Sequence, residues 1–162
     1  MVLKKFQKKF ESLPNLQSFS AYFNKITDIP SEIANCQTLF FLNISHNPLK
    51  KLPKRPLSLD RLTASNCQIE SFDNPFGELF DLNLQSIHLK LVDLSGNKLT
   101  SFTSLPSIQI LNLSQNHITK MPLITDNIRI LDLSCNDLHS APDSMPDSIT
   151  GPSIVDLNLS YN

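Results

Sequence analysis

Two aspartates are the strongest candidates for chemistry in this sequence. Asp93 and Asp132 occupy the same place in two copies of a short apolar pattern, and Asn112 occupies it in the copy between them. If each copy holds one strand of a parallel sheet, the two carboxylates lie two strands apart, roughly 9–10 Å at about 4.8 Å per strand. That separation suits a general acid and general base of the inverting type, or a cation between the two acids. However, an open sheet face lacks the buried pocket that a general acid needs, so we predict neither.

The other reactive side chains do not gather into a recognisable site. The histidines occupy different places in the repeated pattern, and the three glycines are too few and too scattered for a phosphate-binding loop. We therefore predict no catalytic residue, no bound metal and no cofactor for this chain. The residues considered are His46, His88, His117, His139, Gly77, Gly96 and Gly151.

Composition indicates a globular protein in a reducing compartment. The 162 residues are 40% hydrophobic and 18% charged, and no apolar run reaches the roughly 18 residues of a membrane span. The basic N-terminus lacks the apolar stretch of a signal peptide. The odd number of cysteines, without a close pair, gives no disulfide framework (Cys36, Cys67 and Cys135). We predict a cytoplasmic location, because the Asn-x-Ser sequons at Asn43, Asn112 and Asn158 are written by the repeated pattern itself.

The repeated pattern runs through most of the chain. It reads L-x-x-L-x-L-x-x-N-x-L-x-x-L, and ILNLSQNHI (110–118) and ILDLSCNDL (130–138) show it most clearly. Six complete copies and a truncated seventh carry apolar residues at every one of positions 1, 4, 6, 11 and 14 that they contain. One such unit cannot bury its apolar face alone, so the copies must stack on one another. Position 9 falls at Asn24, Asn47, Cys67, Asn97, Asn116, Asn136 and Asn162.

This pattern resembles that of the leucine-rich repeat family, and the resemblance covers residues 16–162. It implies an α/β repeat fold, a solenoid with a curved parallel sheet on its concave face. Extended, 3₁₀ and short helical segments are implied on the convex face. The family has Asn or Cys at position 9, so Cys67 fits. IPSEI at 29–33 is similar to the intracellular class of the family, which occurs in signalling proteins.

The pattern also predicts local structure. Positions 4 and 6 point into the core, whereas positions 3, 5 and 7 point outward, because side chains alternate along a strand. The position 9 residues form a structural ladder that satisfies buried main-chain groups, and Cys67 is its weakest donor. SEIANCQT (31–38) predicts a short helix with Ser31 as its N-cap. Repeats four to six are too short for a helix and are expected to return as extended or 3₁₀ segments. The insertion at 73–88 is expected to be a loop, with one or two helical turns over FGELFDL as the alternative.

Position 3 indicates where a partner binds. It carries aliphatic residues in three consecutive repeats, and these point away from the core beside the polar position 5 row. The alternative is that branched residues simply suit a strand. Position 8 adds Phe23, His46 and Tyr161 as anchors. The predicted partner-binding residues are Phe41, Asn43, Leu91, Asp93, Ile110, Asn112, Ile130 and Asp132.

The two ends of the chain raise separate expectations. In residues 1–15, Leu3, Phe6, Phe10 and Leu13 form one helical stripe, which predicts an amphipathic helix that caps the first repeat. The alternative is a basic helix lying on an anionic membrane, because lysines flank the stripe. At the other end the seventh repeat stops at Asn162, without a cap. We expect either a fragment of a longer chain or self-association through this edge.

Charge is unevenly distributed. Residues 1–61 carry ten Lys/Arg and four acids (+6), and residues 62–162 carry four Lys/Arg and eleven acids (−7). The basic residues around 50–61 have no interleaved aromatic residues, so we predict no nucleic-acid binding; a solvated loop or contact with acidic lipid or an acidic partner fits better. They are Lys50, Lys51, Lys54, Arg55 and Arg61.

The sequence favours a non-enzymatic scaffold that binds a protein partner on the concave face. The alternative, which the resemblance also allows, is a targeting segment of a larger signalling enzyme, such as a metal-dependent serine/threonine phosphatase. A third hypothesis is peripheral membrane attachment through the N-terminal helix.

Overall fold

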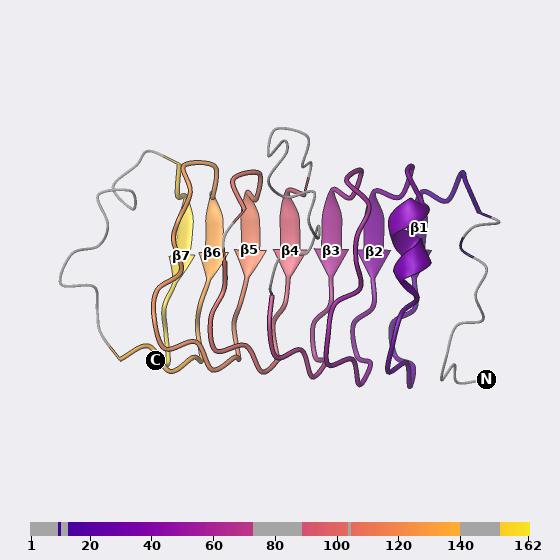
Figure 1. Cartoon of the computed structure of the whole chain (residues 1–162). Helices are drawn as coiled ribbons and strands as arrows, with labels where there is room; N and C mark the ends of the chain where they lie inside the picture. The colour runs from indigo at the N-terminus through magenta and orange to yellow at the C-terminus, as the bar shows by residue number, and fades with distance from the viewer. Residues whose placement is uncertain (1–9, 11–12, 73–88, 104, 140–152) are drawn as a thin grey trace.

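The strands form one open parallel sheet in which each strand neighbours the next one along the chain. The computed structural model describes residues 10, 13–72, 89–103, 105–139 and 153–162. Figure 1 shows the strands side by side in chain order, as in a solenoid, which confirms the predicted fold. The seven strands of this sheet are β1 (Ser18–Ser20), β2 (Phe41–Asn43), β3 (Arg61–Thr63), β4 (Leu91–Asp93), β5 (Ile110–Asn112), β6 (Ile130–Asp132) and β7 (Asp156–Asn158).

Alternation along each strand places the leucines in a continuous core. In β2, Leu42 is fully buried between Phe41 and Asn43, which are half-buried. Positions 4 and 6 are buried from the second repeat to the sixth, which confirms the prediction, and each buried aliphatic side chain contributes about 1.5–3 kcal/mol. These buried residues are Leu42, Ile44, Leu62, Ala64, Val92, Leu94, Leu111, Leu113, Leu131 and Leu133.

A single short helix, η2 (Ser31–Asn35), occurs in the described residues. It is a 3₁₀ helix, and it buries Ile33 against the core. The expected N-cap was wrong: Pro30 precedes the helix and Ser31 is its first residue. The Ser31 hydroxyl donates to the Glu32 carboxylate at 3.4 Å instead of capping a main-chain N–H. Repeats four to six return through turns and extended segments in their described parts, as predicted.

The turn that follows each strand is left-handed in every repeat, which the sequence did not reveal. The residue at position 8 has a positive φ, between 51° and 64°, in all seven repeats. Only one of the seven is glycine, the residue that adopts this conformation without strain. They are Phe23, His46, Asn66, Gly96, Gln115, Cys135 and Tyr161.

The N-terminal side of the core is covered by Phe10. This side chain is buried, and its ring meets that of Phe19 edge to face at a centroid distance of 5.3 Å. Leu13, from the same predicted stripe, is exposed. Residues 1–9 and 11–12 of the predicted capping helix, and the insertion at 73–88, lie outside the described residues.

Arg55 departs from the expected basic surface. Its side chain is buried, and its guanidinium carbon lies 4.8 Å from the centre of the Phe72 ring, a cation–π arrangement. Burial lowers the pKa of Arg55 to about 9. The exposed basic residues of this region are therefore Lys50, Lys51, Lys54 and Arg61.

Candidate protein-binding face

The residues predicted to bind a partner lie in two rows on one side of the sheet. The position 3 row runs Phe41, Arg61, Leu91, Ile110, Ile130, and the position 5 row runs Asn43, Thr63, Asp93, Asn112, Asp132. The structure brings together six of the eight predicted residues on β4, β5 and β6, here called the central patch. The other two, Phe41 and Asn43, are separated from it by β3, where Arg61 and Thr63 stand.

Aliphatic side chains form one row of the central patch. Ile110 and Ile130 are 37% and 39% exposed, and Leu91 is half-buried beside them. The next residues in β5 and β6, Leu111 and Leu131, are each only 1% exposed, so the outward assignment of position 3 is confirmed. Because strands lie about 4.8 Å apart, the three side chains make a continuous apolar strip roughly 10 Å long.

The polar row of the central patch is held in place by hydrogen bonds within each repeat. Asp93 Oδ1 accepts from the main-chain N–H of Ser95 at 3.0 Å and from its hydroxyl at 2.7 Å. Asn112 and Asp132 make the same pair of bonds to the serines two residues later. This is the local Asx turn that these residues favour. No group of three or more His, Cys, Asp and Glu placed to hold a metal occurs within the described residues.

The position 7 serines are more enclosed than predicted. Ser45, Ser65, Ser114 and Ser134 are buried, although position 7 was expected to face solvent. The reason is that each strand ends at position 5, so alternation no longer fixes the direction of position 7. The hydroxyl of Ser65 instead donates to Ser45 Oγ at 3.1 Å, and that of Ser134 to Asp132 at 2.6 Å.

The position 9 residues connect neighbouring repeats. Asn116 Nδ2 donates to the carbonyl oxygens of Leu94, Leu113 and Ser114 at 2.9–3.2 Å, and its Oδ1 accepts from Leu99 N–H at 3.0 Å. Leu94 and Leu99 belong to the preceding repeat, so one amide joins two repeats. The same set of bonds occurs at Asn47, Asn97, Asn136 and Asn162, whereas Cys67 donates to two carbonyl oxygens through sulfur.

Comparisons with known proteins agree with this geometry. Human oligodendrocyte-myelin glycoprotein is 32% identical over 130 residues, which are 76% of this chain and 28% of that protein. The structure of a leucine-rich repeat protein from Leptospira interrogans is 28% identical, with a TM-score of 0.83 over 98% of this chain and 41% of that one. This chain is a leucine-rich repeat protein. No family model matches it.

A second solved structure that this chain resembles is a leucine-rich repeat ectodomain in complex with a bound factor. It belongs to the plant membrane receptor kinase GASSHO1/SCHENGEN3 of Arabidopsis thaliana, in complex with CASPARIAN STRIP INTEGRITY FACTOR 2. That structure is 27% identical, with a TM-score of 0.71 over 93% of this chain and 19% of the ectodomain. The present chain spans about a quarter of the length of the oligodendrocyte-myelin glycoprotein that it matches.

Position 2 of the repeats forms a rim that sequence reasoning missed. The rim runs Phe40, Asp60, Lys90, Gln109, Arg129, Val155 along the N-terminal ends of the strands. Main-chain bonds align it, since the carbonyl oxygen at each position 2 accepts from positions 2 and 3 of the next repeat. Asp60 pairs with Arg61 at 3.4 Å and with Lys90 at 3.3 Å. Position 2 has no constant residue type, so the pattern gave no signal for it.

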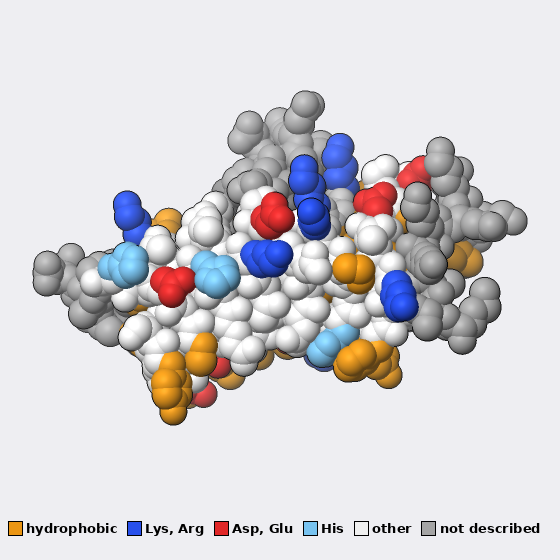
Figure 2. Space-filling view, turned by 90° about the horizontal axis from the view of Figure 1, so that it is seen from below, with side chains coloured by type: hydrophobic (Ala, Val, Ile, Leu, Met, Phe, Trp, Pro, Cys, Tyr) orange, Lys and Arg blue, Asp and Glu red, His pale blue; other side chains and the backbone are white. Residues whose placement is uncertain are grey.

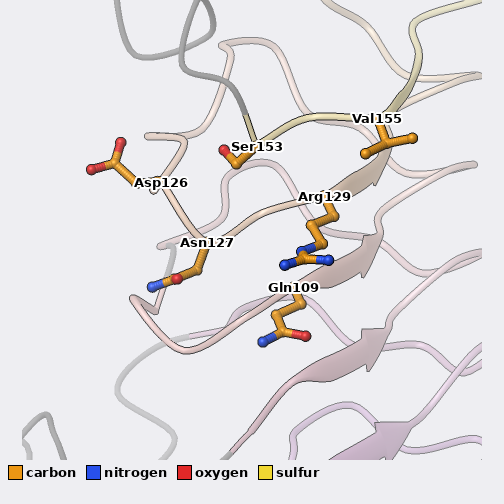
Figure 3. Close-up of a pocket in the computed structure, with 6 residues that line it drawn as sticks. All are labelled: Gln109, Asp126, Asn127, Arg129, Ser153 and Val155. Atoms are coloured by element: carbon orange, nitrogen blue, oxygen red, sulfur yellow. The ribbon is translucent and has the colours of Figure 1, made fainter.

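A hollow of about 380 Å³ opens at this rim beside β5, β6 and β7. Figure 3 shows the side chains that line it, with Arg129 and Gln109 just before the strands and Asp126 further out on the preceding turn. Asn127 Nδ2 donates to the Pro106 carbonyl oxygen at 2.7 Å, which fixes that turn. The lining residues are Gln109, Asp126, Asn127, Arg129, Ser153 and Val155.

The three position 8 anchors lie at opposite ends of the sheet: Phe23 and His46 follow β1 and β2, whereas Tyr161 follows β7. Phe23 and His46 stack in parallel at a centroid distance of 3.9 Å, and Tyr22 meets Phe23 edge to face. Tyr161 is exposed in the seventh repeat, five repeats beyond His46. Figure 2, seen from the C-terminal ends of the strands, shows hydrophobic side chains gathered at each end. The anchors therefore do not join the central patch.

Two further observations concern charge and membranes. His117 Nδ1 lies 3.2 Å from Asp137 Oδ2 in the next repeat, and both side chains are exposed. Among the described residues, no helix has the length and apolar character needed to cross a membrane.

Proposed function

We propose that this chain is a protein-recognition module, and that its outward sheet face, the concave side of the solenoid, binds an extended segment of a partner. The observation that carries the proposal is the outward-facing aliphatic strip of half-buried Leu91 and exposed Ile110 and Ile130, which lies between the position 5 row and the rim. Apolar surface rimmed by polar groups is typical of interaction sites. Seven strands span roughly 30 Å, which accommodates an interface of the standard ~800 Å² per partner.

The roles within the site follow from the hydrogen bonding. The aliphatic strip supplies burial, and Asp93, Asn112 and Asp132 supply register, since the Asx turns hold their side chains before a partner arrives. The chain itself is proposed to be non-enzymatic. The solved plant receptor ectodomain with its bound factor supports the proposal, because its repeats have the same architecture.

The test uses a display library of random dodecapeptides selected on the purified chain. We expect the wild type to enrich a family of peptides and the double variant Ile110→Asp, Ile130→Asp to enrich none, with a melting temperature close to that of wild type. Leu123→Asp is the matched control, since Leu123 is 73% exposed and lies outside the sheet. Unfolding of the double variant, or equal enrichment by it, would contradict the proposal.

A second proposal concerns the context of the module. We propose that residues 16–162 form one repeat domain, that residues 1–15 cap it, and that the domain acts as the recognition segment of a longer signalling protein. The curated relatives are longer than this chain, which supports the proposal. An immunoblot of source cells tests it, because a band near 18.2 kDa contradicts it. Self-association through the β7 edge and membrane attachment through the N-terminal segment are separate hypotheses, testable by sedimentation with and without anionic vesicles.

Location is part of the same proposal. All three cysteines are free, and two of them are buried, which suits the cytoplasm. The names of two relatives, a glycoprotein and a receptor ectodomain, favour the opposite side of a membrane. Glycosidase treatment of the native protein separates the two, because a shift in mobility would exclude the cytoplasm.

A further inference from the structure

Arg129 differs in its neighbours from Lys90, the other basic residue of the rim, and from Arg61, which directly follows the rim residue Asp60. Lys90 and Arg61 both pair with the carboxylate of Asp60. Arg129 stands between Gln109 and Val155 in the same row, and neither carries a charge. Within the part of the chain that the structure describes, Arg129 makes no ion pair. It is therefore an exposed guanidinium whose charge is not neutralised by its own row.

The hollow of about 380 Å³ gives this guanidinium a defined setting. Figure 3 shows the guanidinium of Arg129 and the amide of Gln109 on one wall, reached from the starts of β6 and β5. The main chains of these residues are joined, since Arg129 N–H donates to the Gln109 carbonyl oxygen at 2.8 Å. Ser153, directly before the seventh repeat, lines the hollow with a hydroxyl, and Val155 of that repeat lines it with an apolar surface.

These groups match one kind of ligand. A guanidinium offers parallel N–H donors that fit the two oxygens of a carboxylate, and the Gln109 amide and Ser153 hydroxyl are further donors. We propose that this hollow binds the side-chain carboxylate of an Asp or Glu in the partner. The inference rests on the proposed function, because the hollow adjoins Ile110 and Ile130, each the residue directly after a rim residue. The partner segment then places an aliphatic side chain on the strip and an acidic side chain at the rim.

Acidic neighbours limit the ligand to a single carboxylate. Asp126 lines the same hollow, but Figure 3 shows its carboxylate directed away from the guanidinium. Asp132 and Asp156 lie on the adjoining strands. A polyanion such as a phosphate chain or nucleic acid would meet these charges, whereas one carboxylate at Arg129 would not. The same acids favour a basic residue elsewhere in the partner segment.

The experiment repeats the dodecapeptide selection with Arg129→Gln and compares the enriched sequences with those of wild type. We expect wild type to enrich Asp or Glu near an aliphatic residue, and Arg129→Gln to lose that preference while keeping the aliphatic one. For one selected peptide measured by fluorescence anisotropy, changing its Glu to Gln should weaken binding to wild type about tenfold. The same change should leave binding to Arg129→Gln unaltered.

Lys90→Gln is the matched control. It removes the same charge from the same rim, but from a side chain already paired with Asp60. If Lys90→Gln loses the carboxylate preference as strongly as Arg129→Gln, the effect is general electrostatics and the inference is overturned. Enrichment of aliphatic peptides without acidic residues also overturns the carboxylate site at Arg129, but it still supports the proposed protein-recognition function. If wild type enriches no more than the Ile110→Asp, Ile130→Asp variant, both proposals fail.

Discussion

Asn47 and Cys67 occupy the same position of neighbouring repeats, but only Asn47 accepts a hydrogen bond from a main-chain N–H of the preceding repeat. Asn47 Oδ1 accepts from the main-chain N–H of Ile26 at 3.0 Å. The equivalent N–H beside Cys67 is that of Leu49, and it donates instead to the Asn47 carbonyl oxygen at 2.8 Å. Cys67 Sγ lies 3.5 Å from the carbonyl oxygen of Ile44 and 3.6 Å from that of Ser65. The ladder of amides is therefore interrupted at the third repeat.

Replacing Cys67 with Asn should repair this interruption. The new amide oxygen would accept from Leu49 N–H, as the other repeats do, and raise the free energy of unfolding by about 1 kcal/mol. The larger side chain has room, because Cys67 borders an open hollow of about 340 Å³ next to Asn66 and Gln68. Guanidinium denaturation measures the change. The reciprocal variant Asn116→Cys should lose stability, and a stable Asn116→Cys would refute the explanation.

Asn116→Ala should be among the costlier polar substitutions. Its side chain is buried and makes four hydrogen bonds to main-chain groups of two repeats. Removing it leaves those groups without partners, which costs about 1–3 kcal/mol. Asn162→Ala is the comparison, because Asn162 makes equivalent bonds at an exposed position where water replaces them. Equal losses in thermal unfolding would show that burial does not set the cost.

The three cysteines should differ in reactivity. Burial raises the pKa of the Cys36 and Cys67 thiols, so little thiolate forms near neutral pH and reagents cannot reach it. Cys135 is exposed at the left-handed turn of the sixth repeat. A native sample treated with a chromogenic disulfide reagent should release one equivalent rapidly, and an unfolded sample three. Two rapid equivalents in the native protein would contradict the burial of Cys36 or Cys67.

The core and the sheet were predictable from the sequence because both depend on a constant residue type. Leucine at positions 4 and 6 dictates which face of each strand is buried, so the outward direction of Ile110 and Ile130 followed. The Asn ladder followed for the same reason. Phe41 and Asn43, which were predicted as partner-binding residues together with the six residues of the central patch, are separated from that patch by β3, where Arg61 lies.

Other features depend on positions whose residues vary. The rim hollow at Arg129 is built from position 2 of three repeats and from the turns that precede two of them, and none of these positions has a constant residue type that would predict it. The burial of Ser134 arises after the strand has ended, where a period of two no longer applies. The left-handed position 8 was hidden because its residue type varies, and only Gly96 and Asn66 among its seven residues are types that favour that conformation. Arg55 shows that a charged residue in a basic run is not thereby exposed.

The left-handed turns lead to a prediction at Gln115, whose φ is 56°. An L-residue in this conformation is strained by roughly 1–2 kcal/mol, and a β-branched residue is strained further. Gln115→Gly should therefore raise the free energy of unfolding by up to about 1 kcal/mol, because relief of strain outweighs the added freedom of the unfolded chain. Gln115→Val should lower it by about 1 kcal/mol or more.

The converse change at Gly96 completes the comparison. Its φ is 64°, and an added Cβ would lie 2.6 Å from Asn66 Oδ1, at the end of a side chain that can rotate away. Gly96→Ala should therefore destabilise through backbone strain, by about 1 kcal/mol or more. Removing the contact separates the two causes: when measured against the Asn66→Ala single variant, Gly96→Ala should still lose the part of the stability that comes from backbone strain and recover only the part that comes from the Asn66 contact. Full recovery in thermal unfolding would show that crowding, and not the left-handed backbone, governs this turn.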